Sequence, residues 1–351
     1  MNIAEVTYQF VNYGEHLKPT KNVLALDVGM KTVPGVIDHH HPEAEIECTA
    51  SLVVKYPHLV LDHIKREDSG EEKKMPLRLH IITHRLPDFD SLSSIFLSIK
   101  LLETGQVDPH MEKIALYTKM VDSSSLPKEI DLTSTPYSIL RSLFTGLYKE
   151  DEKETSLERI REGLKFMNFL YSKSVEGYEI IQNRILFSGI DRYERAMLKA
   201  ENDYINYLAV IGRARKMILF LPLVSGQGKK KVDGLIIKNP RSFLLKEWAH
   251  RDRENSSLQE GFSFLLTNIG NKRYFLGVDP EKGVNLRGLG DVLNEKETKK
   301  RTEEGRSLGF RWYDGNCPFF NYRIIDAPQD VTSLSHAEIV EALLFFSQHQ
   351  E

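Results

Sequence analysis

The sequence contains the stretch Gly35-Val36-Ile37-Asp38-His39-His40-His41-Pro42-Glu43. A short apolar run, residues 33–37, is followed there by an acid and then by consecutive histidines. The same order recurs elsewhere, at Asp27 after residues 23–26, at His84 after residues 77–83 and at Asp122 after residues 114–121. Short apolar runs bounded in this way are typical of buried strands in a parallel sheet. Because ligands bind outside the carboxyl ends of such strands, we expect these polar groups to meet at one edge.

A second run, Thr83-His84-Arg85-Leu86-Pro87-Asp88-Phe89-Asp90, places a histidine and two acids in one loop. Apolar residues at helical spacing over residues 91–102 predict a helix after it, capped by Ser91 or Asp90. Several buried acids would repel one another and raise each other's pKa unless a cation lay among them. Histidine and carboxylate donors without thiolate suit manganese, and the start of the helix favours a phosphate.

Composition and charge exclude several classes of protein. The chain has 351 residues with 41% hydrophobic and 28% charged residues, which is ordinary globular composition. A formal net charge of −3 argues against a partner such as long duplex nucleic acid. Cys48 and Cys317 lie far apart, so neither a thiolate zinc site nor a disulfide framework is expected. No apolar leader occurs in residues 1–18, and the longest apolar run, residues 217–224, is too short for a bilayer, so we expect a cytoplasmic protein without membrane contact.

The patterns predict an α/β protein with a parallel-sheet domain in residues 1–150, a helical connector in 151–215 and a smaller α+β domain in 216–351. The connector is rich in Glu, Lys, Arg and Leu, with few Gly or Pro. In the last domain the expected strands are residues 217–224, 232–238, 262–268, 274–278 and 322–325, and the expected terminal helix is 335–346.

These motifs resemble those of the DHH phosphoesterases. GVIDHHHPE at 35–43 is similar to the motif that names the family, THRLPDFDSLSS at 83–94 to its first metal motif, and MVDSSS at 120–125 to its last aspartate motif. The segments 277–293 and 312–328 resemble, more distantly, the substrate-binding DHHA1 domain. Two features depart from the family: Asp38-His39-His40 precedes the His84 run instead of following it, and Asn316 stands where a glycine-rich run ends in histidine.

The resemblance implies a centre of two manganese ions, for which magnesium or cobalt would be substitutes. His84 and Asp88 would bind the first ion, and Asp90, His39 and Asp122 the second. Asp27 would bridge the two ions. A hydroxide between the ions would then attack phosphorus, so that no protein nucleophile is required.

The resemblance also implies roles around the metals. His40 would contact the phosphate, and Asp38 would hold a ligand histidine in one tautomer. Arg287 and Arg311 would hold further phosphates, since arginine grips phosphate with two donors, and Asn316 would lie near the substrate.

The sequence therefore predicts a manganese-dependent phosphoesterase acting on short oligonucleotides or a related small phosphoester, similar to the nanoRNase and cyclic-dinucleotide branch of the family. A hydrolase of polyphosphate or pyrophosphate would use the same metals. A nucleotide-binding regulatory module without turnover and a structural metal site are further alternatives. A homodimer is compatible with all of these interpretations.

Overall fold

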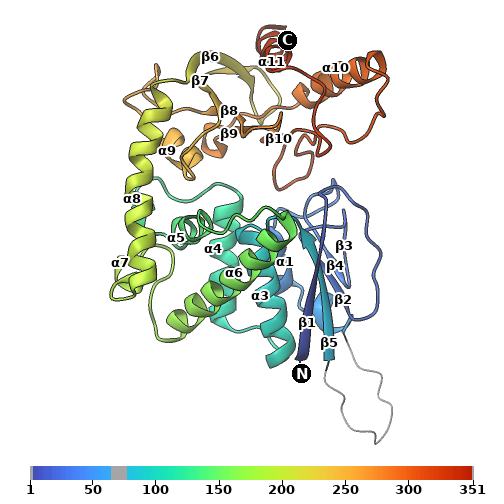
Figure 1. Cartoon of the computed structure of the whole chain (residues 1–351), viewed down its shortest axis with the longest axis vertical. Coiled ribbons are helices and arrows are strands. Elements are labelled where there is room, and N and C mark those ends of the chain that lie inside the picture. Colours follow the sequence, from blue (N-terminus) through green and yellow to red (C-terminus); the bar gives the residue numbers. More distant parts are fainter. Residues whose placement is uncertain (1–2, 65–76, 350–351) are drawn as a thin grey trace, which may run out of the picture. The chain divides into compact units, whose positions relative to one another are not determined.

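The computed structural model describes residues 3–64 and 77–349 and forms two compact units. The first unit is Met1–Ala200 with Cys317–Phe319, and the second is Glu201–Asn316 with Phe320–Glu351. Each unit contains its own five-stranded sheet with helices packed against it, as Figure 1 shows, so the chain belongs to the α/β class. Both sheets are mixed, whereas the sequence predicted a parallel sheet for the first unit.

The first sheet has the strand order β1-β5-β2-β4-β3. Its strands are β1 (Ile3–Val11), β2 (Val23–Leu26), β3 (Thr32–Val33), β4 (Val36–Ile37) and β5 (Leu77–His84). Strands β1, β5, β2 and β4 run parallel, so their carboxyl ends lie at the same edge, and only β3 is antiparallel to its neighbour. The run expected as one strand, residues 33–37, is instead a tight hairpin at Gly35, where a Cβ atom would lie 2.4 Å from the His63 ring.

Helices of the first unit pack beside this sheet, and Figure 1 shows α3, α4 and α6 to one side of the strands. These helices are α1 (Thr49–Lys55), α2 (His58–Leu61), α3 (Phe89–Thr104), α4 (Pro109–Asp122), α5 (Pro136–Phe144), α6 (Glu152–Val175) and α7 (Arg184–Phe187), and α8 (Asp191–Ile211) begins in this unit. The helix predicted over 91–102 lies inside α3. Its cap is Asp88, whose carboxylate accepts from the Ser91 N–H, so the prediction of Ser91 or Asp90 as the cap was wrong.

The prediction of a strand over residues 114–121 was also wrong, because these residues form most of α4. The carboxylate of Asp108 accepts from the first free N–H groups, and Pro109 occupies the first turn, which are both signals of a helix start. The buried side chains Met111, Ile114, Thr118 and Val121 recur every three or four residues. A short apolar run alone does not distinguish a buried strand from a helix face.

The second unit is a sheet between two helical layers. Its strand order is β10-β9-β8-β7-β6, made of β6 (Arg215–Pro222), β7 (Lys229–Lys238), β8 (Phe264–Asn268), β9 (Tyr274–Val278) and β10 (Ile324–Asp326). Alternate residues of β7 and β8 face opposite cores. Helices α10 (Leu289–Glu303) and α11 (His336–His349) cover one face, and α9 (Leu245–Arg251) with the end of α8 covers the other.

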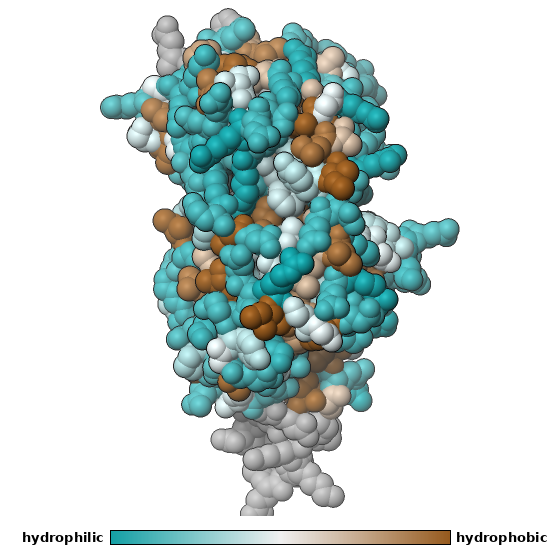
Figure 2. Space-filling view, turned by 90° about the vertical axis from the view of Figure 1, so that its left-hand side faces the viewer, coloured by the Kyte–Doolittle hydropathy of each residue, from teal (hydrophilic) through white to brown (hydrophobic). Residues whose placement is uncertain are grey.

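The surface is mostly hydrophilic on the face drawn in Figure 2, where hydrophobic residues are scattered among polar ones. Exposed apolar side chains include Leu198, Ile205 and Leu208 of α8. Among residues 3–64 and 77–349, no helix combines the length and apolar character needed to cross a bilayer.

Candidate metal centre

The predicted metal-binding residues of the first unit converge from three strand ends and two helix ends. Asp27 directly follows β2, the segment Asp38-His39-His40 directly follows β4, and His84 ends β5. Because these strands are parallel, their ends place the side chains at one edge of the sheet. Asp88 and Asp90 lie at the start of α3, and Asp122 is the last residue of α4 instead of following a strand.

One group of potential ligands consists of Asp27, His84 and Asp88, whose donor atoms all lie within 4.8 Å of one another. His84 Nε2 lies 3.3 Å from Asp27 Oδ2 and 3.7 Å from Asp88 Oδ1. Two atoms that share one ion, each at about 2.0–2.2 Å, lie about 3–4 Å apart. The spacing of this group therefore fits a single divalent ion.

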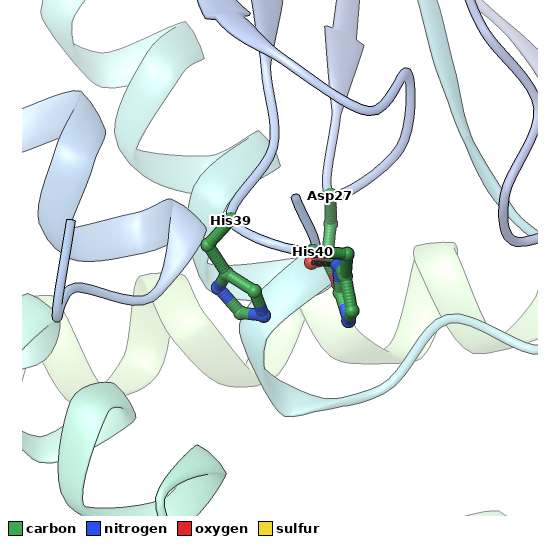
Figure 3. Close-up of side chains that lie close together, drawn as sticks. All are labelled: Asp27, His39 and His40. Carbon is green, nitrogen blue, oxygen red and sulfur yellow. Dashed lines mark ion pairs between the residues drawn. The ribbon is translucent and has the colours of Figure 1, made fainter. Parts of the chain in front are cut away.

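A second group consists of His39, Asp90 and Asp122, again with donor atoms within 4.8 Å of one another. His39 Nδ1 lies 3.7 Å from Asp90 Oδ2, and His39 Nε2 lies 3.7 Å from Asp122 Oδ2. Asp27 also groups with His39 and His40, and Figure 3 shows the His40 ring beside the Asp27 carboxylate. Asp27 is thus within reach of ligands from both groups, as a bridging acid requires.

Backbone groups fix the orientation of several of these side chains. His84 Nδ1 donates to the Arg85 carbonyl at 2.8 Å, which directs Nε2 towards the acids. The two oxygens of Asp90 accept from the first turn of α1, from Thr49 N at 2.8 Å and Ala50 N at 2.9 Å. The Thr49 hydroxyl donates to Asp27 Oδ1 at 3.2 Å, so one residue contacts an acid of each group.

Asp38 orients His40 instead of His39. Its Oδ1 lies 2.7 Å from His40 Nδ1, and its Oδ2 accepts from Met30 N at 2.7 Å. Burial disfavours charge on His40, but the Asp38 carboxylate outweighs it and raises the pKa of His40 to about 9. In the metal-free protein His40 is therefore a proton donor at neutral pH.

The acids of the centre crowd one another. Burial, and after it the charges of Asp27 and Asp88, raises the pKa of Asp90 to about 8. Burial opposes a charge on His84, yet its hydrogen bonds to Asp27 and Asp88 raise the pKa of His84 to about 10. Burial and the neighbouring His40 lower the pKa of His39 to about 4, so His39 is neutral and offers a lone pair. Oxygen and imidazole donors with excess negative charge fit divalent cations such as Mn²⁺.

Helix α6 holds the loop between His84 and Asp88 through Leu86, whose φ of 53° is in the left-handed region. Leu86 N donates to Ser156 Oγ at 2.9 Å, and Leu86 O accepts from Arg159 Nη1 at 3.1 Å. Sequence patterns gave no sign of these two residues, because they lie in the segment interpreted as a connector.

Two other neighbours of the centre were also missed. The ring of Tyr13 stacks on the His84 ring with 4.4 Å between centroids. Thr49 is contributed by the packing of α1 against α3. For Tyr13 and Thr49 the local signal was an aromatic or polar residue type within about 15 residues of a motif.

The predicted substrate-binding residues lie in the second unit. Arg287 is exposed, and its guanidinium lies 4.6 Å from the centroid of the Tyr322 ring. Arg311 lines a cavity of about 440 Å³ with Asp291, Asn294, Glu295, Thr298 and Lys299. Asn316 is exposed and does not line this cavity.

Comparison with known proteins does not assign a family, since no protein-family model matches the sequence and no curated protein matches it. Inferences about function therefore depend on the motifs and on the geometry of the centre.

Proposed function

We propose that the chain is a two-metal phosphoesterase that hydrolyses a small phosphoester, such as a short oligonucleotide. The observation that carries this proposal is the pair of adjacent ligand groups with Asp27 within reach of both. Their membership agrees with the roles that the DHH resemblance implies: His84 and Asp88 in one group, and His39, Asp90 and Asp122 in the other. The reversed order of the motifs along the chain is no obstacle, because parallel strand ends meet regardless of sequence order.

Two divalent cations, when bound, lower the pKa of a water and offset the charge of the phosphate. The protein supplies rigid donors for them, since Thr49, Ala50 and the Arg85 carbonyl hold the ligand side chains in place. His40, oriented through Nδ1 by Asp38, donates from its other nitrogen to a phosphate oxygen. Preorganised donors of this kind stabilise developing charge without a reorganisation cost.

The substrate contacts, the identity of the ion, the cellular location and the oligomeric state are parts of the same proposal. Arg311, Arg287 and Asn316 are the proposed contacts of a substrate phosphate, and Arg311 lines a cavity of the second unit with Lys299, Asp291 and Glu295. Manganese is the proposed ion because the donors are carboxylates and imidazoles. A cytoplasmic location and a homodimer remain predictions from the sequence.

The test is hydrolysis of a panel of substrates with added Mn²⁺: a dinucleotide, a five-residue oligoribonucleotide, cyclic di-AMP, pyrophosphate and polyphosphate. The Asp88→Ala/Asp90→Ala double variant loses the turnover, because each group loses an acid. Asp191→Ala is the matched control, since Asp191 is an exposed acid of α8 that pairs with Arg195. It retains the wild-type rate.

The panel also separates the alternatives. Turnover confined to pyrophosphate and polyphosphate would identify a phosphoanhydride hydrolase built on the same centre. Mn²⁺ binding without turnover of any substrate would contradict the phosphoesterase proposal and favour a regulatory nucleotide-binding module.

A further inference from the structure

Ser91 lies at the middle of the Asp27, His84 and Asp88 group, in a place that the ligand motifs do not explain. Its Oγ lies 2.8 Å from Asp27 Oδ2 and 3.2 Å from Asp88 Oδ1, and it is in hydrogen-bond contact with His84 Nε2. One hydroxyl oxygen thus touches all three donor atoms that would surround an ion. Ser91 is fully buried, so water does not compete for the hydroxyl.

The hydroxyl accepts a hydrogen bond from His84 Nε2 while that nitrogen carries a proton, and it loses this bond when an ion replaces the proton. It has one proton, and both carboxylates are acceptors, so it donates to only one of them at a time. His84 Nδ1 faces the Arg85 carbonyl and must carry a proton there, which leaves Nε2 as the nitrogen that binds an ion. With an ion bound through Nε2, the Ser91 oxygen keeps lone pairs that face the same centre.

The position of Ser91 is fixed by the backbone. Its N–H donates to Asp88 Oδ1 at 3.0 Å as part of the cap of α3, and its carbonyl accepts from Ser94 Oγ at 2.8 Å. The side chain has a single rotatable bond between its backbone and its oxygen, so the fixed backbone leaves the oxygen few positions. Serine and threonine hydroxyls bind Mg²⁺ in phosphate-binding loops, which shows that a neutral hydroxyl is a competent donor for oxygen-preferring cations.

We propose that the Ser91 hydroxyl is a fourth protein ligand of the divalent cation held by Asp27, His84 and Asp88. The proposal rests on the proposed two-metal function. It assigns this group three oxygen donors and one nitrogen donor, a set that favours Mn²⁺ or Mg²⁺ over softer ions. The competing explanation is that Ser91 only positions Asp27 and Asp88 through hydrogen bonds.

Exchange of oxygen for sulfur distinguishes a ligand from a positioning residue. Ser91→Cys places a soft donor at the centre, so the ratio of Cd²⁺ affinity to Mn²⁺ affinity rises by about tenfold or more over wild type. One equivalent of Cd²⁺ also produces a thiolate-to-cadmium charge-transfer absorption. Ser94→Cys is the matched control, because Ser94 is equally buried on the same helix and lies one turn further on. The absorption of the wild-type protein with Cd²⁺ is subtracted from that of each variant, which removes any contribution of Cys48 and Cys317.

A second measurement covers the case in which the cysteine variant does not fold. In Ser91→Ala a water takes the place of the hydroxyl, so water relaxation by bound Mn²⁺ reports one more coordinated water per chain than in wild type. An unchanged water count, or a cadmium absorption no larger than in Ser94→Cys, would overturn the assignment. If wild type binds two Mn²⁺ ions in that case, the two-metal function still stands. If wild type binds no divalent ion, both proposals fail.

Discussion

Each unit buries carboxylates, but the two units neutralise them differently. In the second unit Glu297 accepts from Arg301 Nε at 2.7 Å and from Ser333 N at 2.7 Å, and Trp312 and Thr332 also donate to it. Burial opposes its charge, but these donors outweigh burial and lower the pKa of Glu297. The protein itself thus supplies the cation and the hydrogen bonds that this acid needs.

In the first unit the buried acids Asp27 and Asp90 and the half-exposed acid Asp88 face histidines and one another. The pKa of Asp90 rises to about 8, the opposite direction from that of Glu297. A buried acid with an arginine is a completed structural network. A buried acid such as Asp90, whose pKa is raised by burial and by neighbouring carboxylates, belongs to a group that a bound cation would complete.

The largest expected effect is on the completed network. Arg301→Met leaves Glu297 and Asp330 without their cation, and because Arg301 is 1% exposed we expect a loss of about 3–5 kcal/mol in the free energy of unfolding. Tryptophan fluorescence during urea unfolding measures it, since Trp248 and Trp312 both lie in the second unit. Lys300→Met, which breaks a more exposed pair with Glu338, is the control and costs much less. Equal losses in the two variants would show that the buried Arg301 network contributes no more to stability than the more exposed Lys300–Glu338 pair.

Added metal should stabilise the first unit selectively. An ion at 100 times its dissociation constant adds about 2.7 kcal/mol for each site. Hydrogen exchange measures this as slower exchange in β5 and α3, with no change in β7 and β8. Slower exchange in the second unit alone would place the metal elsewhere.

Metal binding should release protons, because His84 and Asp90 are protonated at pH 7 in the metal-free protein, with pKa values of about 10 and 8. Because binding releases these protons, Mn²⁺ affinity rises with pH, by about 1.4 kcal/mol for each pH unit and each released proton. Calorimetric titration in two buffers of different ionisation enthalpy counts the protons. Affinity that falls as pH rises from 6 to 8 would contradict this description of the centre.

The smallest expected effect is on the stability of the metal-free protein when an acid of the centre loses its charge. Asp88→Asn keeps a good cap for α3, and the half-exposed Asp88 carboxylate interacts with His84 under partial solvent screening, so the free energy of unfolding changes by less than about 1 kcal/mol. The Mn²⁺ affinity falls at least tenfold in the same variant. Thermal unfolding and metal titration of one preparation measure both. A large loss of stability would show that Asp88 is mainly structural.

Patterns along the chain predicted the parts of the centre that are local. Asp27, His39 and His84 follow runs of apolar residues, and parallel strand ends bring such residues together without further information. The helix after Asp88 was predicted because its apolar spacing is a local signal.

What the sequence did not reveal depends on packing between distant segments. Asp122 was assigned to a strand end because eight apolar-rich residues precede it, and only packing decides between a strand and a buried helix face. Thr49, Ser156 and Arg159 hold the ligand loop and the acids from α1 and α6, and their positions follow from how those helices pack on α3. Ser91 was predicted as a possible cap, whereas its hydroxyl faces the ligands.

The most direct test of a two-metal centre is anomalous X-ray diffraction from crystals of the full chain grown with Mn²⁺. We expect two peaks about 3.5–4 Å apart. One peak lies within bonding distance of His84 and Asp88, the other within bonding distance of Asp90 and Asp122, and Asp27 lies between them. If no peak appears at this edge of the first sheet and Mn²⁺ is bound only at surface acids, the chain does not have a two-metal centre here.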